Sequence, residues 1–361
     1  MKRHKICKII FAILAVFLCV AFYELIGICI TYKKQPAVSD ATIKETQNIM
    51  SVAGRENTER AVIIEKNSQA LLERVRLIQN AKDEIILSTF AFKSDESGKL
   101  ILGALHDAAD RGVHVRILVD GMESWIDMEG NPYFYGLSSH ENVEIKLYNK
   151  ANPLKPWKTM GRMHDKYLIA DGKIYILGGR NTYNYFLGDF PGHKNFDRDV
   201  LVVCDEPQKD NSVNQLWNYF ETIWEQEDCR YFHNSKKLAD RQSVKKAVLE
   251  LQKGYQQYFE VNKEKICDTD YADETFETEK ITLLSNPIHT GAKEPVVWYQ
   301  LGELMKNAKE RVKIHTPYII CNDMMYNTWE EIAQKVPDFS IMTNSVANNG
   351  NPFGAADYAK N

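Results

Sequence analysis

One segment of the sequence, residues 164–181, holds side chains whose types and spacing suit chemistry on a phosphate ester. Its polar residues and paired glycines are His164, Lys166, Asp171, Gly178, Gly179 and Asn181. An imidazole can attack phosphorus, while a lysine ammonium and an asparagine amide can hold phosphoryl oxygens. A lone histidine on a strand, or a lone Gly-Gly pair, has an ordinary structural explanation, so it is the combination that indicates a catalytic site.

The local pattern predicts how these groups are brought together. Residues 167–170 (YLIA) are typical of a short strand, in which alternate side chains point to opposite faces. His164 and Lys166 are two positions apart and therefore share a face. An Asp-Gly-Lys turn follows the strand and returns the chain to the Gly-Gly pair, which permits close backbone approach, and to Asn181. Imidazole, ammonium and carboxamide are thus expected at one end of a hairpin.

Periodicity on either side of the hairpin predicts an α/β fold. Apolar residues recur at helical spacing over 68–83, and a strand, a helix and a second strand are expected over 84–90, 97–110 and 113–120. This β-α-β order predicts a sheet with parallel strands, covered by helices. Further strands are expected at 143–148, 166–170, 173–178 and 199–204.

Composition narrows the class of protein. The 361 residues are 44% hydrophobic and 26% charged, which is typical of a globular chain. The net charge of -4 gives no overall positive field to attract nucleic acid. None of the seven cysteines has the short paired spacing of a zinc site.

The N-terminus predicts a membrane anchor. Residues 9–30 are apolar except for Glu24, and about 20 apolar residues suffice to cross a bilayer. A cleaved signal peptide is the alternative, but its apolar core is shorter and small residues mark its cleavage site. Basic residues are more numerous before the span than after it. The positive-inside rule therefore predicts a cytosolic N-terminus and an extracytoplasmic catalytic domain.

The chain also contains a weak internal repeat. NAKDEIIL begins at Asn80 and NAKERVKI at Asn307, and each joins an apolar helix to a strand. We interpret this as a duplicated half-domain, with chance similarity as the alternative. The expected organisation is an anchor (1–34), a stalk (35–60), a first half-domain (61–205), a helical connector (206–280) and the start of a second half-domain (281–361).

The pattern His-x-Lys-x4-Asp followed by Gly-Gly-x-Asn resembles the signature of the phospholipase D superfamily. The stretch from about 60 to 361 is similar to its bacterial cardiolipin synthase branch, most clearly over the helix and strands of 77–121 and over RMHDKYLIADGKIYILGGRN. The resemblance implies a duplicated α-β-α sandwich, which follows the N-terminal transmembrane helix. The motif is specific to the superfamily, whose members include nucleases and hydrolases as well as lipid transferases.

The resemblance also implies roles for individual residues. His164 would be the nucleophile and form a phosphohistidine, while Lys166 and Asn181 would bind the phosphate. Asp171 would belong to the catalytic set as a support for the motif, and the two glycines would support it as well. Asp199 would orient a histidine, with an ordinary acidic residue at a strand start as the alternative. The implied mechanism needs no metal or other cofactor.

Three functions remain open on this basis. The leading one is a phosphatidyltransferase that converts two phosphatidylglycerols into cardiolipin and glycerol. A phospholipase D hydrolase or nuclease with the same chemistry is the second, and an inactive remnant that binds phosphate or lipid is the third. We expect a phospholipid substrate and a membrane as partners, and no nucleic acid. Trp157, between Lys155 and Lys158, is compatible with a membrane contact or with plain loop packing.

The sequence departs from the family in one respect. Superfamily members use two such motifs, one histidine attacking and the other protonating the leaving group, and this sequence contains one. Offsets of 224 to 227 residues between the two copies of the repeat place the second histidine near 388 to 391, beyond Asn361. We therefore expect a truncated second half and no turnover by this chain alone. A homodimer in which each copy supplies His164 is possible but not favoured, because the second half-repeat already occupies the partner's place.

Overall fold

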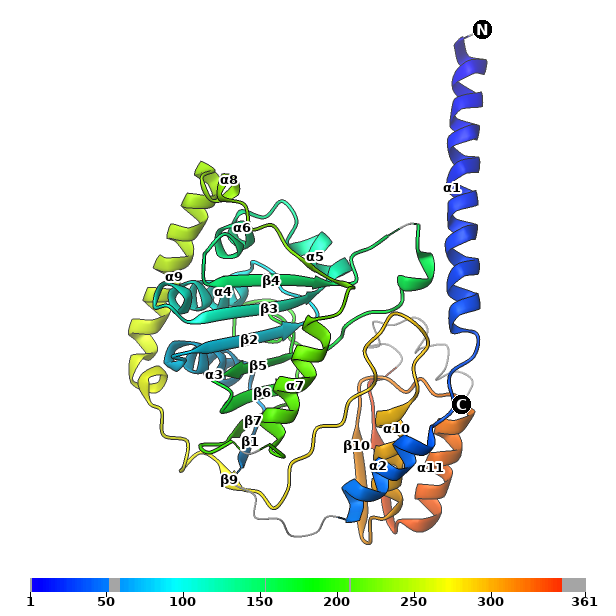
Figure 1. Cartoon of the computed structure of the whole chain (residues 1–361), viewed down its shortest axis with the longest axis vertical. Coiled ribbons are helices and arrows are strands. Elements are labelled where there is room, and N and C mark those ends of the chain that lie inside the picture. The colour runs from blue at the N-terminus through cyan, green and yellow to red at the C-terminus, as the bar shows by residue number, and fades with distance from the viewer. Residues whose placement is uncertain (1, 52–58, 153, 208, 346–361) are drawn as a thin grey trace. The chain divides into compact units, whose positions relative to one another are not determined.

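The computed structural model describes residues 2–51, 59–152, 154–207 and 209–345. These residues form two compact units (Figure 1). The first takes its described residues from 1–33, 54–283 and 288–291, and the second from 34–53, 284–287 and 292–361. The motif that contains His164 lies entirely within the first unit.

A nine-stranded mixed sheet is the centre of the first unit, with the strand order β8-β4-β3-β2-β5-β6-β7-β1-β9. Strands β2, β3 and β4 are parallel neighbours, as the β-α-β pattern predicts, and β5 runs antiparallel to β2. The hairpin of β5 and β6 then leads through β7 to β1, each pair antiparallel. The strands are β1 (Arg60–Ile64), β2 (Glu84–Thr89), β3 (His114–Asp120), β4 (Val143–Tyr148), β5 (Tyr167–Ala170), β6 (Ile174–Gly178), β7 (Asp199–Val203), β8 (Cys229–Tyr231) and β9 (Phe276–Glu277).

Helices cover both faces of this sheet, which gives three layers. Alternate residues of β2 point to opposite faces, so Ile85 and Leu87 join one buried cluster and Ile86 joins another. The first cluster is covered by α3 (Asn67–Asn80), α4 (Glu96–Asp110), α6 (Pro132–Ser138) and α9 (Gln242–Cys267), with α8 (Lys236–Ala239) beside them. The second cluster lies under α7 (Ser212–Trp224).

The region 206–280, interpreted from sequence as a helical connector, contains elements that complete this first unit. Helix α7 packs on the sheet, and α9 packs on α3 and α4 through buried side chains such as Leu251. The short strands β8 and β9, which the sequence did not predict, extend the sheet at its two ends. Their side-chain pattern is too short to show a strand period.

The N-terminal helix α1 (Lys2–Tyr32) contains a span, Ile6–Tyr32, that is long and apolar enough to cross a membrane. Its length matches the roughly 20 residues that a bilayer requires. The second helix, α2 (Asp40–Ser51), falls within the region expected to be a stalk. It belongs to the second unit.

The second unit repeats the element order of α3, β2, α4 and β3 in the first. It contains α10 (Val296–Lys306), β10 (Arg311–His315), α11 (Asp323–Lys335) and β11 (Asp338–Met342). Strands β10 and β11 are parallel neighbours, like β2 and β3, and the buried side chains Val312, Ile332 and Val336 pack between strand and helix. Helix, strand, helix and parallel strand thus occur in both halves, as the internal repeat indicates.

The packing of α9 generates a stability prediction. Leu251 is buried in the first cluster, whereas Leu249 of the same helix is exposed. We expect Leu251→Ala to lower the free energy of unfolding by about 2–5 kcal/mol, because it leaves a cavity under α9. Leu249→Ala is the matched control and should change it by less than about 0.5 kcal/mol. Denaturant unfolding of the full chain in detergent measures the free energy of unfolding of both variants. Equal effects of the two substitutions would contradict the assignment of α9 to the first core.

Candidate active site

The sheet register places the start of β5 beside the carboxyl end of β2. Ser88 of β2 pairs with Tyr167 of β5, and the preceding residues of the β5 segment lie next to Phe90. The imidazole of His164 packs on the Phe90 ring with 4.5 Å between ring centroids. The Lys166 Nζ lies 5.2 Å from the same ring centroid and donates to the His164 carbonyl at 2.6 Å. Phe90 therefore contacts both His164, the candidate nucleophile, and Lys166, the side chain expected to bind the phosphate.

The environment of His164 favours a neutral imidazole. The residue as a whole is exposed to solvent, although the Phe90 ring packs against its imidazole. Burial, followed by the positive charges of Lys166 and Arg162, nevertheless lowers the pKa of its imidazole to about 4, against a weaker opposing effect of Asp120. The imidazole is therefore uncharged at neutral pH. A neutral imidazole carries the lone pair that a nucleophile needs.

Lys166 is buried, at 5% exposure. Burial lowers the pKa of its ammonium to about 8, while the carboxylates of Asp165, Asp197 and Asp120 act in the opposite direction. At neutral pH the group remains mostly protonated. A desolvated ammonium interacts more strongly with an anionic ligand than a hydrated one does.

The Gly-Gly pair lies at the same end of the hairpin, where the Gly178 N–H donates to the Lys166 carbonyl at 3.1 Å. A Cβ on Gly178 would lie 2.0 Å from Asp199 Oδ1, and a Cβ on Gly179 would lie 2.1 Å from Asp197 Oδ2. Gly178 requires glycine, because its Cβ would also lie 2.6 Å from the Arg198 backbone oxygen, whereas a Cβ on Gly179 would meet only the Asp197 side chain. This is the close backbone approach that the sequence predicts.

Asn181 is hydrogen-bonded to Ala91, the residue that follows Phe90. Its side chain is almost completely buried, and its Oδ1 accepts from the Ala91 N–H at 3.2 Å. That hydrogen bond fixes the orientation of the amide, because Oδ1 points to Ala91 and the Nδ2 group points away from it. The hairpin thus brings His164, Lys166 and Asn181 to one end, as the sequence predicts.

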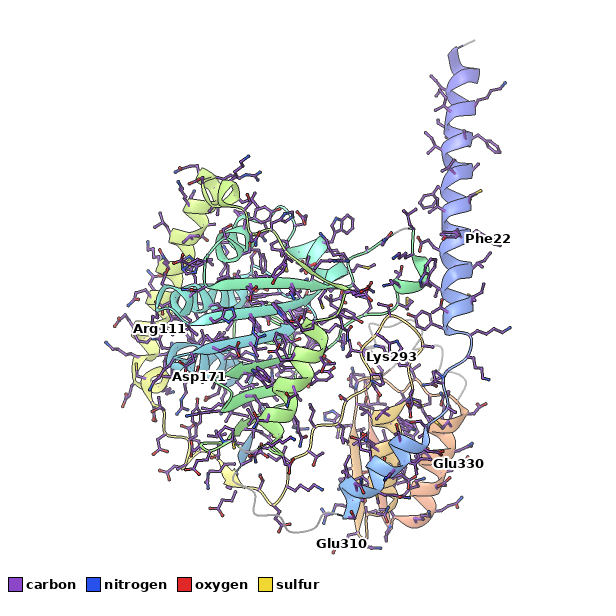
Figure 2. The ribbon with its side chains drawn as sticks, viewed as in Figure 1. Phe22, Arg111, Asp171, Lys293, Glu310 and Glu330 are labelled. Atoms are coloured by element: carbon purple, nitrogen blue, oxygen red, sulfur yellow. The ribbon has the colours of Figure 1, made fainter. Side chains whose placement is uncertain are left out.

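Asp171 lies at the other end of β5, where Figure 2 shows it at the end of the sheet remote from α5. Its φ of 51° and the 62° of Gly172 form the turn of the hairpin. The Asp171 carboxylate accepts from the backbone N–H groups of Lys82, Asp83 and Glu84. The carboxylate thus fixes the hairpin to the joint between α3 and β2, one strand length from His164. Its membership of the catalytic set, as a support for the motif, stays a prediction.

Asp199, which the family resemblance implies would orient a histidine, contacts two arginines, and the implied role stays a prediction. The side chain is buried, and its Oδ2 accepts from Arg74 Nη1 at 2.9 Å and lies 3.2 Å from Arg180 Nη1. A buried carboxylate is costly unless it is paired, and these two guanidinium groups pair it. The geometry therefore gives Asp199 a structural role beneath the Gly-Gly pair.

Asp120 and Arg162 take part in the site and were not recognised from the sequence. Asp120 is fully buried, caps α5 (Gly121–Asp127), and accepts from Arg162 Nε at 2.9 Å with each carboxylate oxygen. Its Oδ2 also accepts from the Met163 N–H at 3.2 Å, immediately before His164. Its position in the sequence could have indicated a site residue, because Asp120 is the last residue of a parallel strand and ligand sites of α/β sheets lie at such strand ends.

Asp197 was missed as well. It contacts Gly179 and is one of the acids that oppose the lowered pKa of Lys166. Among the described residues, no group of three or more His, Cys, Asp or Glu side chains is arranged to hold a metal ion. The arrangement combines a neutral imidazole, a buried ammonium and a fixed amide, which together can bind and attack a phosphate ester.

Comparison with known proteins gives the family context. Residues 75–224 match the family model described as "Cardiolipin synthase, PLD-like domain". An uncharacterised protein of Helicobacter pylori is 27% identical over 319 residues, which are 81% of this chain and 60% of that protein. Cardiolipin synthase C of Escherichia coli is 29% identical over 154 residues, which are 39% of this chain and 31% of that protein. The matches thus span about three fifths and about one third of these relatives' lengths.

Among solved structures, the phosphatidylserine synthase of Haemophilus influenzae has a TM-score of 0.56 at 15% identity. The similarity covers 88% of this chain and 71% of that protein. At this identity the likeness shows a shared fold. It extends over both compact units, because the first unit alone does not reach that coverage.

The environment of His164 generates a prediction about its protonation. With a pKa of about 4, its imidazole stays neutral at about pH 5.5, where an imidazole of ordinary pKa near 6.5 is mostly charged. Diethyl pyrocarbonate modifies the neutral form, so we expect rapid modification of His164 at that pH, mapped by peptide mass spectrometry. A free peptide that contains residues 160–170 is the reference and should react much more slowly.

The matched variant is Phe90→Ala, which admits water to the imidazole. We expect the pH dependence of His164 modification to shift towards that of the free peptide. If the wild-type protein and the peptide lose reactivity over the same pH range, the neutral-imidazole assignment is wrong.

Proposed function

Since residues 75–224 form a phospholipase D-like domain of the cardiolipin synthase branch, we propose that this protein is a phosphatidyltransferase. The donor and acceptor are both phosphatidylglycerol, and the products are cardiolipin and glycerol. The observation that carries the proposal is the neutral imidazole of His164 beside the buried ammonium of Lys166, within the domain that matches the family.

In the first step, a His164 imidazole nitrogen attacks the phosphorus of phosphatidylglycerol. The bond from phosphorus to the head-group glycerol breaks, the glycerol oxygen takes up a proton, and a phosphatidyl-histidine remains. In the second step, a glycerol hydroxyl of another phosphatidylglycerol attacks this phosphorus and loses its proton. The phosphorus–nitrogen bond breaks, cardiolipin leaves, and His164 is restored. With water in place of the second lipid, the same step would be hydrolysis to phosphatidic acid.

The other residues of the site act on the phosphate or on its surroundings. Lys166 and the Asn181 amide bind the non-bridging phosphoryl oxygens, where the negative charge of the transition state gathers. Asp120 and Arg162 hold the chain segment that leads into His164, and Asp171 fixes the far end of its hairpin. The leaving glycerol also needs a proton donor. Because the 361 residues contain a single His-x-Lys motif, the proposal requires that a group outside this motif supplies the proton.

The reaction can be tested in membranes from a host that expresses the intact gene product, with labelled phosphatidylglycerol in the presence of a chelator. We expect cardiolipin to form and an acid-labile phosphate adduct to map to His164. His164→Ala should remove both, and Lys166→Ala should reduce cardiolipin formation by at least about 10²-fold, since both residues act on the same phosphate.

His114→Ala is the matched histidine control, because His114 begins β3 at the far end of the sheet and is expected to leave activity unchanged. Retention of more than a few per cent of the activity by His164→Ala would exclude the proposed nucleophile. Formation of phosphatidic acid alone would favour a hydrolase, and cleavage of added DNA without lipid transfer would favour a nuclease.

We also propose that α1 anchors the protein in the cell membrane with its N-terminus in the cytosol, since basic residues are concentrated ahead of the span. The catalytic unit then faces away from the cytosol. Protease added to intact spheroplasts should digest this unit, while a cytosolic marker protein survives. Full protection of the unit, with digestion only after lysis, would reverse the orientation.

A further inference from the structure

The segments around the candidate active site carry large apolar side chains that the core does not cover. The exposed fractions of Trp125, Leu154 and Phe196 are 67%, 77% and 87%. Singly exposed apolar residues are normal on a protein surface, but a group of them marks a site of interaction. We define the docking surface as Trp125, Ile126, Leu154, Trp157, Met160 and Phe196, each of them exposed.

These side chains come from three connections at one end of the sheet. Helix α5 follows β3, the short helix η1 (Pro156–Lys158) lies between β4 and β5, and Phe196 precedes β7. The carboxyl ends of β3 and β4 and the start of β5 lie at this end, and so does the start of β7, where Asp199 pairs with Gly178. Figure 1 shows α5 and the η1 segment at this end. The docking surface therefore borders the segment that carries His164.

The composition of this surface fits the boundary layer of a bilayer. Tryptophan is enriched at membrane interfaces, because its ring is apolar and its N–H is polar. The exposed Lys150 and Lys155 precede η1, and lysines near a membrane surface are attracted to anionic head groups. The binding partner that this surface fits is therefore a layer of anionic phospholipid.

The membrane helix supplies an independent observation. Within the first unit, the Tyr23 hydroxyl of α1 donates to the Leu154 carbonyl at 3.5 Å. Tyr23 falls inside the span that is apolar enough to cross a membrane. A bilayer that surrounds α1 would consequently meet the connection between β4 and β5, where three of the six docking residues, Leu154, Trp157 and Met160, lie.

We propose that the docking surface seats the first unit on the phospholipid head-group layer, so that His164 reaches the phosphate of a lipid that stays in the bilayer. This inference rests on the proposed function for its substrate, a phospholipid. Beyond the proposed function, the inference names the side chains outside α1 that contact the membrane. It also gives the direction from which the lipid enters the site.

The positions of the tryptophans allow a direct test with the full chain. The protein has six tryptophans, and none lies in α1. The chain is reconstituted in vesicles of phosphatidylglycerol and phosphatidylcholine, with part of the phosphatidylcholine brominated on its acyl chains close to the head group. Bromine quenches tryptophan fluorescence on contact, so we expect quenching in the wild-type protein although α1 contributes no fluorescence. In the double variant Trp125→Phe/Trp157→Phe, quenching should fall to less than about half of the wild-type value.

Trp217→Phe is the matched control, because Trp217 of α7 is partly buried and donates to Glu84 Oε2 at 3.1 Å. It should leave the quenched fraction essentially unchanged. Equal quenching in the double variant and the wild type, or no quenching in either, overturns the proposal. Fluorescence that changes with protein concentration and is not quenched by brominated lipid overturns it in favour of a protein partner.

Cardiolipin formation is measured with the intact gene product in the same vesicles, which separates the two proposals. Cardiolipin without tryptophan quenching refutes the docking surface and leaves the proposed function standing. Quenching that the double variant loses, in a protein that makes no cardiolipin, supports the docking surface and refutes the proposed activity.

Discussion

The contact of Phe90 with the segment 162–166 is the constraint on which the candidate site depends. One aromatic ring packs against the imidazole of His164 and lies within 5.2 Å of both the Lys166 ammonium and the Arg162 guanidinium. Partial burial of the imidazole, and then the two cations beside it, lower the pKa of His164 and keep it neutral. The cost of gathering the cations is offset by carboxylates, since Asp120 pairs with Arg162 and Asp197 lies near Lys166.

Around this contact, the hairpin of β5 and β6 acts as a rigid support that is fixed at both ends. At one end, the Gly-Gly pair lies against the carboxylates of Asp197 and Asp199, and Asp199 is neutralised by two buried arginines. At the other end, the Asp171 carboxylate accepts from three consecutive backbone N–H groups. The side chains that face the proposed substrate are few, and most of the charged groups of the motif serve to place them.

Much of this arrangement could be predicted from the sequence, because it is encoded locally. The strand period over 167–170, the turn residues after it and the Gly-Gly pair determine the hairpin and the convergence of His164, Lys166 and Asn181. The contacts of Asp171 and Asp199 could not be predicted in this way. Each joins residues far apart in the chain, such as Asp199 with Arg74, and no local pattern records which helix will pack over which strand. The contact of Phe90 with His164 could not be predicted either, because an aromatic residue at a strand end is ordinary in any α/β sheet.

The position of β1 has a consequence for how the chain is made. This strand lies early in the sequence, yet its two sheet neighbours are β7 and β9, so Arg60 pairs with Val203 and with Glu277. During synthesis on the ribosome, α1 and β1 emerge long before either neighbour exists. The sheet cannot close on that side until residue 277 has been translated, and pairings that are distant in sequence form slowly. A nascent chain would thus hold β1 without a sheet neighbour until residue 203 has been translated, and an unpaired strand edge is a template for wrong pairing.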